Sequence, residues 1–171
     1  MLDHVQTPPN STSLSMYEKE FKEIVNKELM KECYIGPFPF MTIEAAIGPF
    51  QSSPLSLIPK PGKPGKFCLV QNFSFPIQTS THFPNLSVNN AITTDLLPCT
   101  WGKFSTIFLL VARLPPGLQA ATQDVVEVYR TIPLHKLQWP VAIMHISKTS
   151  ACIDMCSIWG VTLVWGLWTS N

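Results

Sequence analysis

The order of apolar patterns along this 171-residue sequence predicts a mixed α+β fold. A helical pattern comes first, two extended runs around a turn rich in glycine and proline follow, and a second helical pattern leads into further short strands. Because helices and strands do not alternate regularly, a parallel sheet of repeated strand–helix units is not expected. The sequence contains no internal repeat and no low-complexity tract.

The first helix is expected between residues 15 and 33. Ser15 and Glu18 have the spacing of a capping box, in which two side chains satisfy free N–H groups at the start of a helix. Apolar residues then recur three or four positions apart, as one face of a helix requires: Phe21, Ile24, Val25, Leu29 and Cys33. Gly36 and Pro37 are expected to end this helix.

A β-hairpin is expected after a connection over residues 36–50. Two extended runs at 53–60 and 67–74 flank a turn rich in glycine and proline, which is typical of a hairpin. The turn carries three lysines without a nearby acid: Lys60, Lys63 and Lys66. A basic tip of this kind can contact phosphate groups, although a solvated turn is the commoner role for three lysines.

The second half of the chain is expected to add one helix and several short strands. A loop-rich region at 76–98 comes first. Thr100 can then cap a helix from Trp101 to about Arg113, and the Pro-Pro-Gly sequence after it stops the helix. The expected strands follow: 131–134, 139–146 and 151–155.

Composition and charge exclude some classes of protein. Hydrophobic residues make up 46% of the chain, charged residues 13%, and the net charge is +1. Such a charge gives no global field that would favour nucleic acid or a membrane, so any basic patch must be local. No apolar stretch reaches the roughly 20 residues needed to cross a bilayer. Residues 1–15 lack the features of a secretory signal and are expected to be a disordered lead-in.

The cysteines indicate reduced thiols in an intracellular protein, although no address signal is visible. Their number is five, which is odd, and their spacing is irregular. Cys152 and Cys156 have no second pair and no histidine at a metal-like distance, so a zinc site is not expected. The apolar stretch 158–168 is expected to be a core segment whose covering partner is missing.

The stretch 121–135 links the second helix to the last strands, and after a short polar approach it reaches the acid Asp124. A buried acid is costly unless a metal ion or a basic side chain meets it. Considered alone, this stretch is most simply interpreted as a strand and turn with a surface aspartate. Its neighbours along the chain favour another interpretation.

The order of these segments resembles the fingers and first part of the palm of a reverse transcriptase, closest to the retroelement enzymes common in fungal genomes. The hairpin sequence SSPLSLIPKPGKPGKFCLVQNFSFP comes first, then SVNNAI, and then the signature D-V-x-x-x-Y-R-x-I-P-L-H from Asp124 to His135. The resemblance runs from about Phe21 to the end of the chain. It implies an incomplete right-hand polymerase fold with three parts: a lead-in at 1–15, a fingers-like region at 16–100 and a partial palm at 101–171.

The resemblance implies RNA-directed DNA polymerase chemistry, in which Mg²⁺ promotes nucleotidyl transfer to a primer. The carboxylate of Asp124 and the carbonyl of Val125 would hold the metal. Tyr129 would lie under the sugar of a deoxynucleotide and exclude a 2′-hydroxyl. The implied partners are an RNA or DNA primer–template, a deoxynucleoside triphosphate and the remainder of a retroelement polyprotein, with no membrane.

The resemblance also assigns the residues that would contact the triphosphate. The backbone amides near Glu127 and Val128 would face it. Lys60, or Lys63 because hairpins of the family vary in length, matches the lysine of the fingers that neutralises the γ-phosphate.

Several positions depart from the pattern of the family. Cys68 and Asn72 stand where the family has an arginine and an aspartate, and a thiol cannot supply a bidentate cation. Large side chains stand where small ones are expected near the template: Leu163, Val164 and Trp165. The next motif of the family, an Asp-Asp hairpin, is not found before Asn171, and Asp154 is expected to have a structural or template-side role.

These departures predict that the isolated chain does not polymerise. Two alternatives stay open. One is a non-catalytic nucleic-acid-binding or structural remnant of a retroelement polyprotein. The other is an unrelated interaction domain whose apolar C-terminal segment docks on a partner.

Overall fold

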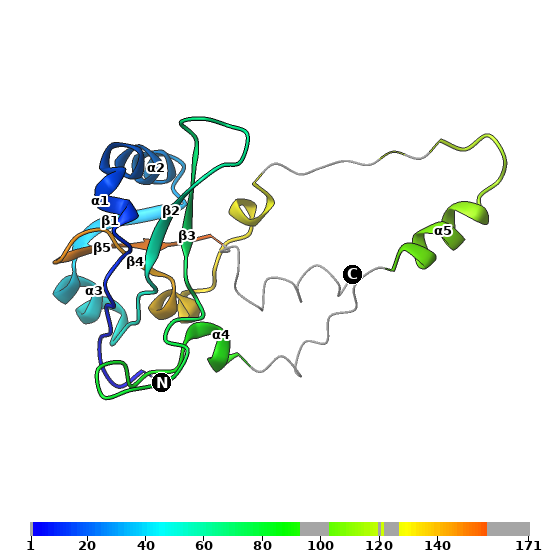
Figure 1. The fold of residues 1–171 in the computed structure, drawn as a ribbon. Coiled ribbons are helices and arrows are strands. Elements are labelled where there is room, and N and C mark those ends of the chain that lie inside the picture. Colours follow the sequence, from blue (N-terminus) through cyan, green and yellow to red (C-terminus); the bar gives the residue numbers. More distant parts are fainter. Residues whose placement is uncertain (1, 93–102, 120, 122–126, 157–171) are drawn as a thin grey trace.

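The computed structural model describes residues 2–92, 103–119, 121 and 127–156, and it has the mixed α+β architecture that the sequence predicts (Figure 1). The first half contains α1 (Ser13–Met16), α2 (Glu18–Met30), β1 (Tyr34–Pro39), α3 (Phe40–Ile47), β2 (Leu55–Pro59), β3 (Phe67–Gln71) and α4 (Val88–Ala91). The second half contains α5 (Phe104–Ala112), the 3-10 helices η2 (Val128–Thr131) and η3 (Lys136–Val141), β4 (Ile143–His145) and β5 (Ser150–Asp154).

A three-stranded antiparallel sheet in the order β1-β5-β4 joins the two halves of the chain. Tyr34 of β1 pairs with Asp154 of β5, and Ile143 of β4 pairs with Ile153. The strand expected at 151–155 is therefore confirmed. The sheet combines a strand from residues 16–100 with two from residues 101–171, so the two regions distinguished in the sequence share one structural unit.

The region after α2 differs from the sequence-based expectation. The helix ends at Met30, and the expected connection at 36–50 holds β1 and α3 instead. Gly36 makes this strand possible, because its φ of 123° is open only to glycine and a Cβ there would lie 3.1 Å from the carbonyl oxygen of Ala151. The register of the β1–β5 pairing shifts next to this glycine, between Ile35 and Phe38.

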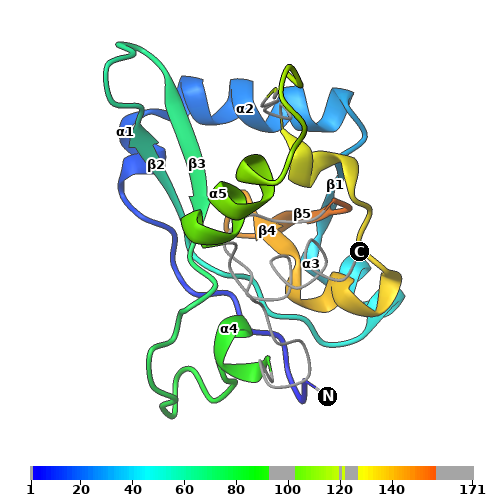
Figure 2. The same cartoon turned by 90° about the vertical axis from the view of Figure 1, so that its right-hand side faces the viewer.

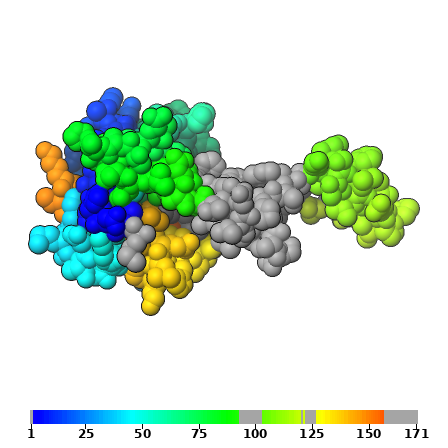
Figure 3. Space-filling model, turned by 90° about the horizontal axis from the view of Figure 1, so that it is seen from below, coloured from blue at the N-terminus to red at the C-terminus, as the bar shows by residue number. Residues whose placement is uncertain are grey.

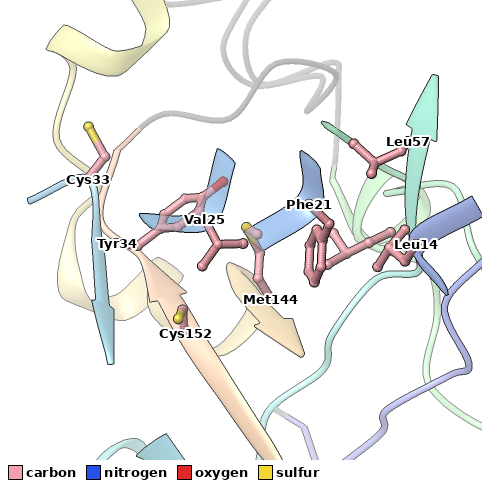
Figure 4. Close-up of a cluster of buried hydrophobic side chains, with 9 residues drawn as sticks. Leu14, Phe21, Val25, Cys33, Tyr34, Leu57, Met144 and Cys152 are labelled. Atoms are coloured by element: carbon pink, nitrogen blue, oxygen red, sulfur yellow. The ribbon is translucent and has the colours of Figure 1, made fainter. Parts of the chain in front are cut away.

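The α2 helix covers the main hydrophobic core with the face that its sequence predicts. Phe21 and Val25 are buried, and Ile24 and Leu29 pack at the edge. Figure 4 shows most members of this core gathered between α2, the hairpin and the sheet. The complete set of buried members is Leu14, Phe21, Val25, Cys33, Tyr34, Leu55, Leu57, Met144 and Cys152.

The prediction that Ser15 and Glu18 form a capping box is wrong. The helical conformation is interrupted between α1 and α2 at Tyr17, whose φ of −122° and ψ of 47° are not helical. The hydroxyl of Ser15 donates to the carbonyl of Thr12 at 2.8 Å within the short α1 helix, so it does not cap α2.

The predicted hairpin is confirmed as the antiparallel pair β2–β3, with Leu55 opposite Gln71 and Pro59 opposite Phe67. Figure 2 shows this hairpin beside the sheet, with its turn reaching up past one end of α2. The ring of Tyr17 lies 4.5 Å from that of Phe67, and Leu57 N–H donates to the hydroxyl of Ser13 at 2.9 Å. These contacts fix the direction in which the lysine-bearing turn points.

A second, smaller core lies between α3 and the other face of the sheet. Its buried members are Ile43, Phe50, Ile143, Ala151 and Ile153. The rings of Phe40 and Phe50 pack edge to face with their centroids 5.9 Å apart, which adds to the burial of this face. Together the two cores cover both faces of the β1-β5-β4 sheet.

The helix expected from Trp101 to Arg113 is described as α5 from Phe104, with Lys103 at its N-cap position. Thr100 and Trp101 lie outside the described residues. All nine residues of α5 are exposed, and Figures 1 and 3 show the helix away from the sheet.

The strand expected at 131–134 is reduced to a single antiparallel β-bridge between Pro133 and Cys156, with Leu134 N–H donating to the carbonyl of Met155 at 2.8 Å. The start of the strand expected at 139–146 is wrong. Residues 128–131 and 136–141 form 3-10 helices, and β4 begins at Ile143. Pro140 lies inside η3 and has no N–H to donate to a sheet. His135 and Gln138 form a reciprocal capping box that stabilises the start of η3, a helix signal that competes with the apolar alternation.

Candidate functional site

Arg130, from the sequence signature, is the centre of a largely buried network of charged and polar side chains. Its Nη1 donates to both carboxylate oxygens of Asp154 at 2.8 Å, and its Nη2 donates to the hydroxyl of Tyr34 at 2.9 Å. Its Nε lies 3.1 Å from Oε2 of Glu28, an ion-pair distance without hydrogen-bond alignment. The Asp154 side chain is 0% exposed and that of Arg130 is 22% exposed, so the cation meets a fully buried acid.

A tight turn places Arg130 in this network. Glu127 adopts the left-handed conformation with a φ of 50°, and Arg130 N–H donates to its carbonyl at 2.7 Å. The hydroxyl of Thr131 donates to the carbonyl of Val128 at 2.7 Å and closes the η2 helix. Because η2 is held in this way, the Arg130 side chain projects toward α2 and the sheet, and Tyr129 is half-buried beside it.

Burial dominates the protonation behaviour of Asp154. It raises the pKa of this carboxyl to about 6, while the charge and hydrogen bonds of Arg130 and the N–H of Cys156 act in the opposite direction. Burial also raises the pKa of Tyr34, and the Asp154 carboxylate adds to that increase. Burial works against the charge of Arg130, but Asp154 and Tyr34 outweigh it and raise its pKa, so the guanidinium stays charged.

Glu127 is the acid of a second group of ion pairs, on the surface. Its Oε1 lies 3.3 Å from Lys27 Nζ, and its Oε2 accepts a hydrogen bond from Lys31. The hydrogen bond from Lys31, followed by that from Lys27, lowers the pKa of Glu127. These side chains are 33–60% exposed, so water screens the charges and the pairs mainly align η2 with α2.

A cavity of about 250 Å³ lies next to the Arg130 network. Its lining joins the sequence signature to the hairpin, since Glu127 and Tyr129 face the same space as Val70 and Gln71 of β3. The remaining lining residues are Glu28, Tyr34, Leu55, Leu69, Arg130, Met144 and Asp154. The cavity therefore combines aromatic side chains, a buried ion pair and residues from both strands of the lysine-bearing hairpin.

The hairpin lysines line a different cavity, of about 430 Å³, between the turn and α2. Its cationic lining is Lys27, Lys60, Lys63 and Lys66, and its acids are Glu20 and Glu23. The two cavities are neighbours along α2, because Lys27 lines one and Glu28 the other. Glu127 and Tyr129 therefore line the same cavity, and Val128 lies between them in the chain as the first residue of η2. Lys60 and Lys63 line the other cavity.

The predicted metal ligands Asp124 and Val125 lie outside the described residues. Within the part of the chain that the structure describes, no group of three or more histidines, cysteines or acidic residues could hold a metal ion. The described residues also include no helix long and apolar enough to cross a membrane.

The structure describes both Cys68 and Asn72, the hairpin positions that differ from the reverse-transcriptase pattern in the sequence analysis. Cys68 is exposed and pairs with Ile58 across the hairpin. Asn72 ends the hairpin, where its N–H donates to the carbonyl of Pro54 at 2.9 Å and its side chain accepts from Ser74 N–H at 3.2 Å. Asn72 therefore has a local structural role in the turn after β3.

Sequence analysis missed the partners of Asp154. The signature contains Arg130, and a buried acid requires a cation, so this pair could have been inferred if the acid of β5 had been recognised as buried. Glu28 and Tyr34 give no local signal, because they meet Arg130 only through the packing of α2 and β1.

Comparisons with protein-family models, curated proteins and solved structures find no match. Evidence for a function therefore comes from the residues of this chain and their arrangement.

Proposed function

We propose that this chain is the fingers and part of the palm of a reverse-transcriptase-type polymerase, and that it contacts primer–template and nucleotide. One observation supports the proposal above others. Tyr129 and Glu127 of the signature share a cavity with Val70 and Gln71 of the lysine-bearing hairpin, although nearly 60 residues separate the two segments in the sequence. An RNA-directed DNA polymerase of this family requires these two segments to lie on one cleft.

In this proposal, the cavity beside Tyr129 receives the sugar of the incoming nucleotide. The ring is half-buried on the cavity wall, which suits contact with a flat, partly apolar group. Gln71 donates from Nε2 to the carbonyl of Ile143 at 3.1 Å and has one side-chain oxygen that is buried without a hydrogen-bond partner. That oxygen can accept a hydrogen bond from a hydroxyl or amino group of a ligand.

The neighbouring lysine cavity is the proposed contact for phosphate groups. Lys60, Lys63 and Lys66 project from the turn, and Lys27 faces them from α2. Four cations around one cavity exceed its two acids, so the local charge is positive although that of the whole chain is only +1. Phosphate contacts of this kind give binding that weakens as salt increases.

Magnesium binding in this proposal depends on Asp124 and Val125, outside the described residues. The described carboxylates nearest the signature do not supply further ligands, because Asp154 is paired with Arg130, and Glu127 with Lys27 and Lys31. Asp124, the one acid of the signature without a described partner, is not enough to hold two divalent ions. The 171-residue chain is therefore proposed to bind primer–template without extending it.

Binding of a labelled primer–template duplex at several salt concentrations tests the first part of the proposal. The double variant Lys60→Ala/Lys63→Ala should lower the slope of log affinity against log salt by about 2, or roughly one per lysine. The matched control is Lys19→Ala/Lys22→Ala, because these lysines are exposed on α2 and pair with Glu23 and Glu18. Absence of binding at low salt, or equal losses in both variants, would contradict the proposal.

A primer-extension assay with Mg²⁺ tests the second part. We expect incorporation at background for the 171-residue chain. Extension that the substitution Asp124→Asn abolishes would overturn the expectation of inactivity, while it would support the polymerase assignment itself.

A further inference from the structure

Two cysteines far apart in the sequence meet at the end of the β1–β5 pairing. Cys33 directly precedes β1, and Cys156 follows β5 by two residues. Met155 N–H donates to the carbonyl of Cys33 at 2.7 Å. Cys33 is a buried member of the main hydrophobic core, and Cys156 packs against that core as a neighbour of the Cys33 thiol. Cys33 is 5% exposed and Cys156 is half-buried, and both are free thiols.

The position of both residues is fixed by backbone hydrogen bonds. Cys33 N–H donates to the carbonyl of Glu28 at 3.0 Å, which ties it to the end of α2. The backbone of Cys156 forms an isolated antiparallel β-bridge with Pro133, and the N–H of Cys156 donates to Oδ1 of Asp154 at 3.0 Å. A pair of thiols held on both sides in this way loses little freedom when a bond forms between them.

The other described cysteines are not placed for such a bond. Cys152 is buried opposite Met144 in the middle of the sheet, and Cys68 is exposed on the hairpin. Figure 4 shows Cys33 beyond the start of β1 and Cys152 lower on β5, apart from each other.

We propose that Cys33 and Cys156 form a reversible intramolecular disulfide site, which a low-molecular-weight disulfide such as oxidised glutathione oxidises. The Cys156 thiolate, which is the more accessible, attacks one glutathione sulfur, and one glutathione leaves as a thiol after taking up a proton. The Cys33 thiolate then attacks the Cys156 sulfur of the mixed disulfide and releases the second glutathione. Two protein thiols become one disulfide, and one oxidised glutathione becomes two reduced ones.

This disulfide would act on the candidate site through its neighbours in the chain. Cys33 precedes Tyr34, and the N–H of Cys156 holds the carboxylate of Asp154. A covalent link between them would hold the two strand ends that carry Tyr34 and Asp154, two of the three partners of Arg130. Because it would also close a long loop from α2 to the last described strand, it should stabilise the folded chain.

The reaction has a distinctive dependence on pH. Burial raises the pKa of the Cys156 thiol to about 12; the neighbouring Cys33 thiol and the Asp154 carboxylate add to this increase, and Arg130 opposes it. Because only the thiolate attacks, the rate of oxidation should rise about tenfold for each pH unit between pH 7 and 9. An exposed thiol with an ordinary pKa of about 8.5 would level off over this range.

Peptide mapping by mass spectrometry tests the site directly. The full 171-residue chain is incubated, folded, with oxidised glutathione at pH 8 and digested without reduction. The expected product is a peptide pair that contains Cys33 and Cys156 joined by a disulfide, which dithiothreitol reverses. A lasting glutathione adduct on Cys156, a free Cys33, or a bond from either residue to Cys68, Cys99 or Cys152 would overturn the proposal.

Variants separate the two steps. Cys33→Ala should accumulate the mixed disulfide on Cys156, because no resolving thiol remains, and Cys156→Ser should leave Cys33 unmodified. Cys68→Ser is the matched control and should form the Cys33–Cys156 bond as the unmodified sequence does. Oxidation should raise Tm by several degrees in the unmodified chain and in Cys68→Ser, but not in Cys156→Ser; an oxidised chain with an unchanged or lower Tm would contradict a bond that fits the native geometry.

Discussion

Arg130 donates from a single nitrogen, Nη1, to both carboxylate oxygens of Asp154, at 2.8 Å each. This contact joins the 3-10 helix η2 to the last strand of the sheet, and Nη2 and Nε extend it to Tyr34 of β1 and Glu28 of α2. One side chain therefore holds three separate elements around the cavity that Tyr129 lines. The position of η2, the part of the signature that carries Tyr129, depends on this arginine.

Replacement of Arg130 should destabilise the fold strongly. Arg130→Met leaves Asp154 buried without its cation, and loss of one partner of a buried pair costs about 3–5 kcal/mol. Urea denaturation measures the change in unfolding free energy. The double variant Arg130→Met/Asp154→Leu should recover a large part of the loss, because it removes both charges; a loss equal to the sum of the single variants would contradict the pairing.

Asp154 should titrate near pH 6 in the folded chain. Burial raises its pKa above the ordinary 3.8, so between about pH 4 and 6 the folded chain binds this proton more tightly than the unfolded chain. The contribution of this group to stability is therefore present below pH 4 and is lost as the pH rises through 6. NMR of the side-chain carboxyl carbon measures the midpoint, and Asp154→Asn should remove this part of the pH dependence. A midpoint below 4 would contradict the dominance of burial.

Much of the fold follows from local patterns in the sequence. The face of α2 that contains Phe21 and Val25, the β2–β3 hairpin and the strand β5 were all predicted, because spacing and turn residues determine them directly. The helix boundary at Tyr17 and the strand β1 were not predicted. Both depend on distant contacts: Tyr17 packs on Phe67, and β1 exists because it pairs with β5.

The candidate site was predictable only in part. The residues Glu127 and Tyr129 follow from the signature, and the structure places both on one cavity. Lys60 and Lys63 line a neighbouring cavity instead, because the turn of the hairpin lies over the outer side of α2. The Arg130 network combines residues from η2, β5, β1 and α2. The spacing of apolar residues within a short stretch of sequence does not show which distant residues will be in contact.

Gly36 should tolerate alanine poorly. Its φ of 123° is unfavourable for any other residue, and a Cβ would lie 3.1 Å from the carbonyl oxygen of Ala151. Strain and close contact together should cost about 1–3 kcal/mol in Gly36→Ala. Gly62→Ala is the matched control, because Gly62 has a positive φ of 67° with no heavy atom within 4 Å of its Cβ position. Urea denaturation compares them, and equal losses would show that the approach of β5 does not contribute.

His145 should make stability depend on pH in the opposite direction from Asp154. Burial lowers its pKa below 6.5, and its Nδ1 lies 2.9 Å from the hydroxyl of the buried Ser52. The unfolded chain therefore binds this proton more readily, so the contribution of His145 is present above pH 6.5 and is lost as the pH falls through the folded pKa. The free energy of unfolding, measured from pH 7.5 down to pH 5, should depend less on pH in His145→Gln than in the unmodified chain. The control His82→Gln changes an exposed histidine and should keep the original dependence. If His145→Gln and His82→Gln changed the profile equally, the buried contact with Ser52 would not be its origin.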